Sequence, residues 1–322
     1  MARVTVQQIY AELKESLGLE LLSEHPEEDV LLHAKDVHRP GMALMGFTAN
    51  FLPGRLQVMG ASEMAYLETL EADDQLTAFQ RVISLDAPAC FVTRGMRVPE
   101  ILLDFARRQK FPLYRSSLDA VDFIAELSRY LEHLFAPRTE VHGSLVDVYG
   151  VGMLFTGRSG IGKSECALDL VERGHRLVAD DIVEIIQTDE EVLIGKYREV
   201  LQHNIEIRGV GVIDIKAIFG IRAIRMQKRI EVEVRLQDWN DNEDYERLGL
   251  ERQYTEILGV RVPRVIVPLF PGKNITVISE VIALDFMLKV YGYDAANILN
   301  QRILETMSSG NQLRGYLRRD KE

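Results

Sequence analysis

A phosphate-binding loop is the clearest chemical feature of the sequence. Residues 157–164, Gly-Arg-Ser-Gly-Ile-Gly-Lys-Ser, match the pattern GxxxxGK[ST], the Walker A motif, in full. The run Val151–Phe155 predicts a buried strand before the loop, and Glu165–Arg173 predicts a helix after it. Strand, glycine-rich loop and helix in this order are the context that the motif requires.

The residue types in this loop suit the binding of a nucleotide. Glycines allow backbone N–H groups to converge on phosphate oxygens, and the start of the helix adds a positive potential. The ammonium of Lys163 is long enough to reach the β- and γ-phosphates, and the hydroxyl of Ser164 suits Mg²⁺. We therefore expect the nucleotide to be held by Gly157, Arg158, Ser159, Gly160, Ile161, Gly162, Lys163 and Ser164.

Three segments outside the loop carry further candidate groups. His142 precedes the loop, and the short apolar run Leu177–Ala179 ends in Asp180-Asp181. Two carboxylates at a strand end could supply a metal contact and a base for an attacking hydroxyl. Glu206 and Arg208 share one face of a predicted strand beside a glycine-rich turn. Taken singly, each segment has an alternative interpretation: His142 as an ordinary loop histidine, Asp180-Asp181 as a turn or helix cap, and Glu206 with Arg208 as a surface ion pair.

The elements that position these groups fall into two predicted domains. Residues 1–135 predict a small N-terminal α/β domain, whose role in regulation, assembly or partner docking stays open, and residues 136–322 form the P-loop catalytic domain.

In the first half we expect helices at Val4–Leu17, Ser62–Leu70, Pro99–Arg108 and Leu118–Leu134, and strands at Val82–Leu85, Cys90–Thr93 and Phe111–Tyr114. In the second half we expect a half-buried strand at Ile230–Leu236 with one charged face, another at Val262–Val267, and helices at Val277–Val290 and Asp294–Met307.

Composition excludes several classes of protein. The 322 residues carry 38 Lys and Arg against 49 Asp and Glu, a net charge of −11, which argues against a nucleic-acid partner. The longest stretch without a charge has 15 residues, Pro40–Gly54, too short to span a membrane. The presence of only two cysteines and the lack of a secretory signal favour a protein of the reducing cytoplasm. The seven histidines lack the spacings of metal sites, so we expect them at the surface.

A P-loop identifies a nucleotide and leaves the reaction open. An ATPase or GTPase acting as a switch or motor is one alternative, but the LSGGQ and NKxD motifs of such proteins are missing. A small-molecule or carboxykinase-like kinase is a second alternative, although it would not need this kind of N-terminal domain. A binding protein with a degenerate site is a third, which the intact Gly162-Lys163-Ser164 disfavours.

Six blocks together resemble the HPr kinase/phosphorylase family, bacterial enzymes that phosphorylate a serine of the phosphocarrier protein HPr and remove that phosphate again. The blocks are His142-Gly143, Gly157–Ser164, Arg173–Asp181, Glu206–Gly209, Tyr245–Gly249 and Pro271–Asn274. The resemblance implies an N-terminal α/β domain followed by a P-loop kinase domain similar to phosphoenolpyruvate carboxykinase. It also implies a cytoplasmic homohexamer that acts on HPr in the control of carbon metabolism and sugar uptake.

The resemblance also implies roles for particular residues. Lys163 would contact the transferred phosphate of ATP or pyrophosphate, with Ser164 and Glu206 on Mg²⁺ or another divalent cation. Asp181 would exchange the serine proton with support from His142, and Arg247 would stabilise the moving phosphoryl group. The loop serving both reactions would be Ile205, Glu206, Ile207, Arg208, Gly209, Val210, Gly211, Val212, Ile213 and Asp214. The loop for dephosphorylation, with orthophosphate as substrate, would be Pro268, Leu269, Phe270, Pro271, Gly272 and Lys273.

Two positions depart from the family pattern. Arg158 stands where an acidic residue is common, and this should matter little because backbone N–H groups hold the phosphates. Lys273 stands where the family usually has Arg. An ammonium cannot form the bidentate fork of a guanidinium with phosphate, so the phosphorylase direction is the reaction that this departure affects.

Overall fold

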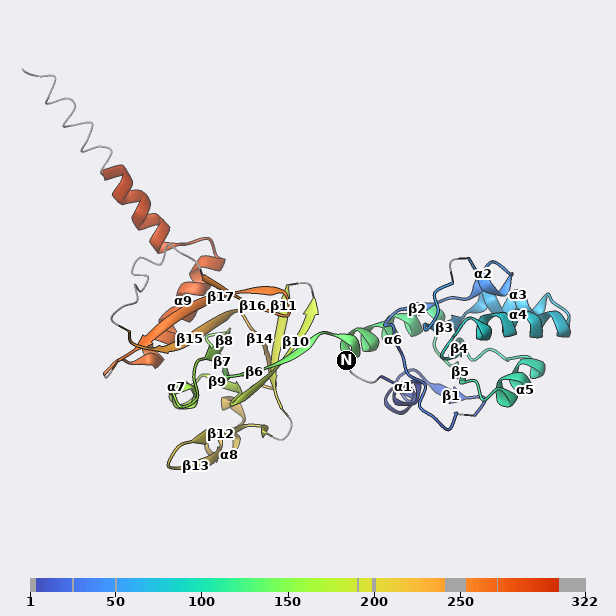
Figure 1. Cartoon of the computed structure of the whole chain (residues 1–322), viewed down its shortest axis with the longest axis horizontal. Coiled ribbons are helices and arrows are strands. Elements are labelled where there is room, and N and C mark those ends of the chain that lie inside the picture. The colour runs from blue at the N-terminus through green and yellow to red at the C-terminus, as the bar shows by residue number, and fades with distance from the viewer. Residues whose placement is uncertain are drawn as a thin grey trace, which may run out of the picture. The chain divides into compact units, whose positions relative to one another are not determined.

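The computed structural model describes residues 4–24, 26–49, 51–189, 191–198, 201–240, 253–270 and 272–306 (Figure 1). Contacts between residues divide the chain into two compact units, Met1–Ala136 and Pro137–Glu322. Both units are mixed α/β structures, and each has its own core.

The first unit is built on a five-stranded sheet with helices on both faces (Figure 1). The strands lie in the order β1 (Leu19–Leu21), β5 (Leu113–Ser116), β4 (Cys90–Val92), β3 (Leu56–Met59) and β2 (Val37–His38), with only the β1–β5 pair antiparallel. The helices are α1 (Val6–Leu13), α2 (Gly41–Leu44), α3 (Ala61–Glu68), α4 (Ala72–Ser84), α5 (Glu100–Arg108) and α6 (Ala120–Phe135).

Alternation along the strands creates two cores, one on each face of this sheet. Cys90 and Val92 face the helices α2 to α5, whereas Phe91 faces α1 and α6. One predicted element is wrong: Val82–Leu85 is no strand, because residues up to Ser84 form the last turn of α4. The amphipathic spacing of α4, which buries Ala78, Phe79 and Val82 on one side, outweighs the β-branched character of that short run.

The second unit contains a six-stranded sheet whose strand directions decide where the site lies. The order is β16 (Gln253–Ile257), β17 (Val260–Leu269), β15 (Val232–Asp238), β8 (Val151–Thr156), β7 (Ser144–Val148) and β9 (Arg176–Ala179). β15 is parallel to both β17 and β8, and β7 is antiparallel to both β8 and β9. The carboxyl ends of β8, β9, β15 and β17 therefore lie at the same edge of the sheet.

Helices and a second sheet cover the two faces of this sheet. One face packs against α7 (Lys163–Glu172) and α9 (Ile275–Val290). The other face packs against a four-stranded sheet of β14 (Gln227–Arg229), β11 (Val192–Tyr197), β10 (Ile182–Asp189) and β6 (Arg138–His142). The hairpin β12 (Asn204–Ile207) and β13 (Gly211–Asp214), α8 (Ile215–Phe219) and the short helix η2 (Ile221–Ala223) complete the unit, and residues 295–306 are helical.

Two expectations about polar residues in this unit are wrong. The charged face predicted for Ile230–Leu236 is not simply solvated, because Glu233 is buried and pairs with Arg264 on the adjacent β17 (2.6 Å). Two of the histidines expected at the surface, His175 and His203, are buried. Glu233 and His175 each pair with a residue distant in the sequence, Arg264 and Glu280, and local patterning does not reveal such partners. Within the described residues, no helix is both long and apolar enough to cross a membrane.

Candidate active site

Four strand ends bring the candidate residues together at one edge of the six-stranded sheet. The phosphate loop follows β8, Asp180 and Asp181 follow β9, β15 ends at Asp238, and residues 268–273 lie at the end of β17. Clefts beyond the carboxyl ends of parallel strands are the usual ligand sites of α/β sheets. The architecture therefore explains how segments up to about a hundred residues apart in sequence contribute to one site.

The phosphate loop depends on glycine at its first position and at the helix start. A Cβ on Gly157 would lie 2.5 Å from the carbonyl oxygen of Leu236 on β15, so a side chain there would collide with the sheet. Gly162 is left-handed (φ +105°) and forms the N-cap of α7. Within the loop, the ammonium of Lys163 donates to the carbonyl oxygens of Gly157 (3.3 Å) and Arg158 (3.2 Å), so the loop curves around its own lysine.

Arg158 uses its side chain to tie the loop to the neighbouring strand. Its guanidinium forms a bidentate pair with Asp238 at the end of β15 (2.5 and 2.9 Å), and hydrogen bonding from this guanidinium lowers the pKa of Asp238. The guanidinium is therefore engaged with a carboxylate, and the contribution of Arg158 to phosphate binding is expected through its backbone.

Asp180 is the buried centre of the site. It is 4% exposed, and its Oδ1 accepts hydrogen bonds from Ser144 on β7 (2.5 Å) and from Ser164 on α7 (3.1 Å). Burial raises the pKa of Asp180, and the two serine hydroxyls and the backbone N–H groups of Asp181 and Glu206 act in the opposite direction by hydrogen bonding. Its Oδ2 is buried and has no hydrogen-bond partner among the residues that the structure describes.

Asp181 differs sharply from its neighbour because it faces solvent. Its side chain is 62% exposed, its backbone is left-handed (φ +65°), and its Oδ1 lies 3.8 Å from Nδ1 of His142, which is 81% exposed. The pairing of β6 with β10 sets this approach, because it places His142 opposite Ile182. Gly143 completes the turn: its N–H donates to the carbonyl oxygen of Asp181 (3.0 Å), and a Cβ there would collide with the carbonyl oxygen of Phe155.

The hairpin β12–β13 places Glu206 and Arg208 beside the phosphate loop. The buried Ile205 anchors the hairpin in the core, while the side chains of Glu206 and Arg208 are exposed. The Arg208 guanidinium lies 3.5 Å from the hydroxyl of Ser159, and a Cβ on Gly160 would come within 2.5 Å of it. Gly160 thus leaves the space that Arg208 occupies against the loop.

The side chain of Lys273 contacts the end of β17. The ammonium of Lys273 donates to the carbonyl oxygen of Pro268 (2.7 Å) and lies 5.2 Å from the ring centre of Phe270, and burial lowers the pKa of Lys273. The N–H of Trp239 donates to the carbonyl oxygen of Leu269 (3.0 Å), which joins this segment to the end of β15. Two of the predicted site residues, Pro271 and Arg247, lie outside the described residues.

From the sequence, the Asp180-Asp181 pair is a candidate source of a metal contact and a base, but only Asp181 is predicted as a site residue. The structure adds Asp180 and Ser144 to the candidate site, since they form a hydrogen-bonded group with Ser164. The signal in the sequence was the pair of aspartates at a strand end. Which of the two lies inside could not be predicted, because this depends on the register between β7 and β9.

The arrangement around Ser164 fits a divalent cation of the magnesium type. Mg²⁺ binds through one or two carboxylates together with substrate phosphates and water. The buried Oδ2 of Asp180 lacks a partner within the described part of the chain, and the hydroxyl of Ser164 lies against the other oxygen of the same carboxylate. The described residues contain no group of three His, Cys, Asp or Glu side chains suited to a metal.

Comparison with known proteins covers both units. The family model for the HPr serine kinase N terminus matches residues 4–131, and the model for the HPr serine kinase C-terminal domain matches residues 133–303. A curated HPr kinase/phosphorylase of Chloroherpeton thalassium is 46% identical over 308 residues, covering 95% of this chain and 91% of the relative. That of Prosthecochloris aestuarii is 46% identical over 327 residues, covering 99% and 96%.

Two further matches are less similar in sequence. The HPr kinase/phosphorylase of Geobacillus kaustophilus is 42% identical over 296 residues, covering 92% of this chain and 95% of the relative. The solved structure of the HPr(Ser) kinase/phosphatase from Coxiella burnetii is 31% identical and has a TM-score of 0.45, covering 50% of this chain and 98% of that one. With both domain models matched and identities above 40% over nearly the whole chain, the protein belongs to the HPr kinase/phosphorylase family.

Proposed function

We propose that this protein phosphorylates a serine of the phosphocarrier HPr, using ATP or pyrophosphate, and removes the phosphate by phosphorolysis to give pyrophosphate. The names of the curated relatives support the HPr substrate and both activities. The observation that carries the proposal is the placement of Asp181 and Lys163. An exposed carboxylate beside His142 stands at the same sheet edge as the phosphate loop, where a protein hydroxyl can reach it.

In the kinase direction, the phosphate loop holds the nucleotide and Asp181 acts as the general base. The serine oxygen attacks the γ-phosphorus in line, the bond between that phosphorus and the bridging oxygen of ADP breaks, and the serine proton passes to Asp181. Exposure suits this role, because the hydroxyl belongs to another protein and must arrive from solvent. His142, whose Nδ1 lies 3.8 Å from a carboxylate oxygen of Asp181, is proposed to support Asp181 in this role.

In the reverse direction the same groups act on phosphoserine. An oxygen of orthophosphate attacks the phosphoserine phosphorus, the bond to the serine oxygen breaks, and that oxygen takes the proton from Asp181 while pyrophosphate leaves. Lys163, Arg208 and Arg247 are proposed to stabilise the charge of the phosphoryl group, with the segment Pro268–Lys273 serving this direction. The position of the Arg208 guanidinium, against Ser159 and Gly160, supports its part in this role.

The cation proposed for this site is Mg²⁺, held by Ser164 and Glu206 together with Asp180. When bound, Mg²⁺ would neutralise charge on the phosphate oxygens. The partnerless carboxylate oxygen of Asp180 beside Ser164 supports this assignment. The backbone of Glu206 is among the groups that act to lower the pKa of Asp180, which supports the nearness of Glu206 to this site.

The wider setting is proposed from the family. We place the chain in the cytoplasm as a homohexamer, with a catalytic domain of residues 136–322 similar to phosphoenolpyruvate carboxykinase and an N-terminal domain of residues 1–135 with a regulatory or assembly role. The phosphate loop between β8 and α7, at the carboxyl ends of the parallel strands β8, β15 and β17 of a mixed sheet, supports the kinase-domain assignment.

Incubation of the protein with HPr, ATP and Mg²⁺ tests the proposed activity. We expect one phosphoserine per HPr molecule, identified by mass spectrometry of the HPr peptides. HPr with that serine replaced by Ala is the control and should take up no phosphate. Phosphorylation of both HPr forms at an equal rate, or of neither, would contradict the proposal.

A further inference from the structure

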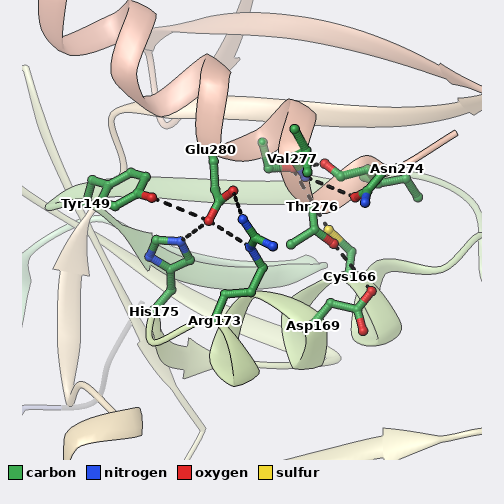
Figure 2. Close-up of polar contacts among 11 residues, drawn as sticks. Tyr149, Cys166, Asp169, Arg173, His175, Asn274, Thr276, Val277 and Glu280 are labelled. Carbon is green, nitrogen blue, oxygen red and sulfur yellow. Dashed lines mark hydrogen bonds and ion pairs between the residues drawn. The ribbon is translucent and has the colours of Figure 1, made fainter.

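A row of polar contacts joins the helix of the phosphate loop to the helix that follows the dephosphorylation segment (Figure 2). Cys166 and Asp169 on α7 and Arg173, its C-cap, are spaced three and four residues apart and so lie on one face. Their partners are on the first two turns of α9. The pairs are Cys166 with Ser279 (Sγ–Oγ 4.0 Å), Asp169 with Thr276 (3.3 Å) and Arg173 with Glu280 (2.6 and 2.9 Å).

Glu280 is the centre of this interface. Both its oxygens accept from Arg173, and its Oε1 also lies 3.1 Å from Nε2 of the buried His175 and 3.5 Å from the hydroxyl of Tyr149 (Figure 2). Hydrogen bonding from Arg173 is the main cause that lowers the pKa of Glu280, so the carboxylate is ionised at neutral pH although it is only 8% exposed.

A carboxylate at this position fixes geometry more than it adds stability. A buried ion pair recovers its desolvation cost only through good geometry, and an apolar residue often stabilises such a position equally well. The contacts of Glu280 are directional: a two-pronged pair with Arg173 and a contact with His175 permit one position of α9 on α7. An apolar contact would tolerate sliding of one helix along the other.

The two helices that Glu280 connects begin at the two loops of the proposed reaction. α7 starts at Lys163, and Arg173 lies ten residues further, about 15 Å along the helix. α9 starts directly after Lys273, with Asn274 as its N-cap, and Glu280 lies six residues further, about 9 Å along the helix. The fit of α9 on α7 therefore sets where Lys273 stands relative to Lys163.

The other end of the segment 268–273 is held independently. Leu269, at the end of β17, pairs with Asp238 on β15, and its carbonyl oxygen accepts from the N–H of Trp239. One end of the segment is thus fixed to the sheet and the other to α7 through α9. The second attachment depends on the charged contacts of the buried Glu280 with Arg173 and His175.

We propose that Glu280 is a positioning residue for phosphorolysis: by holding Arg173 and His175 it sets the place of Lys273, which lies directly before the N-cap of α9, relative to the phosphate loop. This inference rests on the proposed function, since it concerns the effect of Glu280 on the ratio of the two reactions proposed for this site. The kinase direction depends on the phosphate loop and Asp181, which directly follow β8 and β9 and are also tied to the sheet through the hydrogen bonds of Asp180 with Ser144 and Ser164. Loosening α9 therefore affects phosphorolysis more than phosphorylation.

Glu280→Gln tests the inference, since it keeps the size of the side chain and removes the charge. We expect phosphorolysis of phosphoserine-HPr to fall at least about fivefold more than HPr phosphorylation by ATP, with the affinity for ATP changed less than about twofold. Asp285→Asn is the matched control, an exposed carboxylate on the same helix that pairs with Lys289 one turn away. It should leave the ratio of the two rates unchanged.

Arg173→Gln and the double variant separate positioning from general destabilisation. The Arg173 side chain is half-exposed, so its replacement should permit folding, and it should shift the ratio of rates in the same direction. The double variant should resemble either single variant, because both remove one interaction. A proportional fall of both rates in Glu280→Gln, or an unchanged ratio, would overturn the inference and leave the proposed function intact. Wild-type protein with neither reaction would overturn both.

Discussion

His142 and Asp181 meet because two strands pair in one register. The Nδ1 of His142 lies 3.8 Å from a carboxylate oxygen of Asp181, and His142 stands opposite Ile182 in the β6–β10 ladder. A shift by one residue would turn His142 to the other face of the sheet. The carboxylate proposed as the base is thus held beside an imidazole by backbone hydrogen bonds, while both side chains stay accessible to a protein substrate.

Asp181→Asn should separate chemistry from binding. The amide cannot accept the serine proton, so we expect HPr phosphorylation to fall about 10²- to 10⁴-fold. The affinity for ATP, measured by calorimetry, should change less than about twofold, since Asp181 is not part of the phosphate loop. A loss of ATP affinity as large as the loss of turnover would contradict its role as a base.

Asp180→Asn should stabilise the fold while impairing catalysis. Burial raises the pKa of Asp180, which means that the ionised carboxylate is less favourable in the folded protein than in the unfolded chain. The contribution of Asp180 to stability is therefore fully present at low pH, where the carboxyl is protonated, and is lost as the pH rises through the folded-state pKa. The amide removes this penalty, because the hydroxyls of Ser144 and Ser164 can turn to accept from it. At neutral pH without Mg²⁺ we expect a gain of about 1 kcal/mol, or about 2–4 °C in Tm.

The same pair of proteins tests the cation site. Mg²⁺ with ATP should raise the Tm of the wild type more than that of Asp180→Asn, as followed by differential scanning fluorimetry, because binding to the native state stabilises it. At low pH, where Asp180 of the wild type is protonated, the difference in Tm between the two unliganded proteins should vanish. An equal response of both proteins to Mg²⁺ would remove Asp180 from the cation site.

Lys163→Ala should abolish both reactions. The loop would lose the cation proposed to contact the transferred phosphate, and we expect each rate to fall by about 10³-fold or more. Glu172→Gln, an exposed change at the far end of the same helix, is the control and should leave both rates near those of the wild type. Substantial turnover by Lys163→Ala would refute the placement of the transferred phosphate on the loop.

Gly160→Ala should weaken catalysis by displacing Arg208. A Cβ at this position would lie 2.5 Å from the Arg208 guanidinium, and the flexible arginine must move away. We expect kcat/KM for HPr to fall about tenfold, equivalent to about 1.4 kcal/mol of transition-state stabilisation. Gly95→Ala, also at positive φ but with open space around it, controls for backbone strain of roughly 1 kcal/mol. Equal kinetics in the two variants would show that Arg208 has no such role.

Lys273→Arg should preserve or improve phosphorolysis relative to phosphorylation. A guanidinium can bind phosphate through two parallel hydrogen bonds, whereas the ammonium of Lys273 is engaged with the carbonyl oxygen of Pro268. Rates of pyrophosphate formation and of HPr phosphorylation, measured on the same preparation, give the ratio. A selective fall in phosphorolysis would mean that this site is adapted to lysine.

The phosphate loop was predictable because its chemistry is local. Glycine positions, Lys163 and Ser164 lie within eight residues, and the strand and helix around them have clear patterns. The mixed α/β class followed from the same patterns. Val82–Leu85 was misassigned because four residues do not distinguish a β-branched strand from the last turn of an amphipathic helix.

What the sequence concealed depends on contacts between distant residues. His175 was expected at the surface, yet it is buried against Glu280, which lies 105 positions later. The distinct environments of Asp180 and Asp181 follow from the pairing of β9 with β7 and of β10 with β6. Composition and periodicity describe which face a residue prefers, and they contain no information on such partners.

Transfer of label through phosphoserine tests the dual activity most directly. HPr is first phosphorylated with ATP labelled in its γ-phosphate, then freed of nucleotide and incubated with the protein, Mg²⁺ and unlabelled orthophosphate. We predict that the label leaves HPr as pyrophosphate, and that little label is lost when orthophosphate is omitted. Release of the label as orthophosphate at the same rate with and without added phosphate would show hydrolysis, and would contradict a single site that runs phosphoryl transfer in both directions.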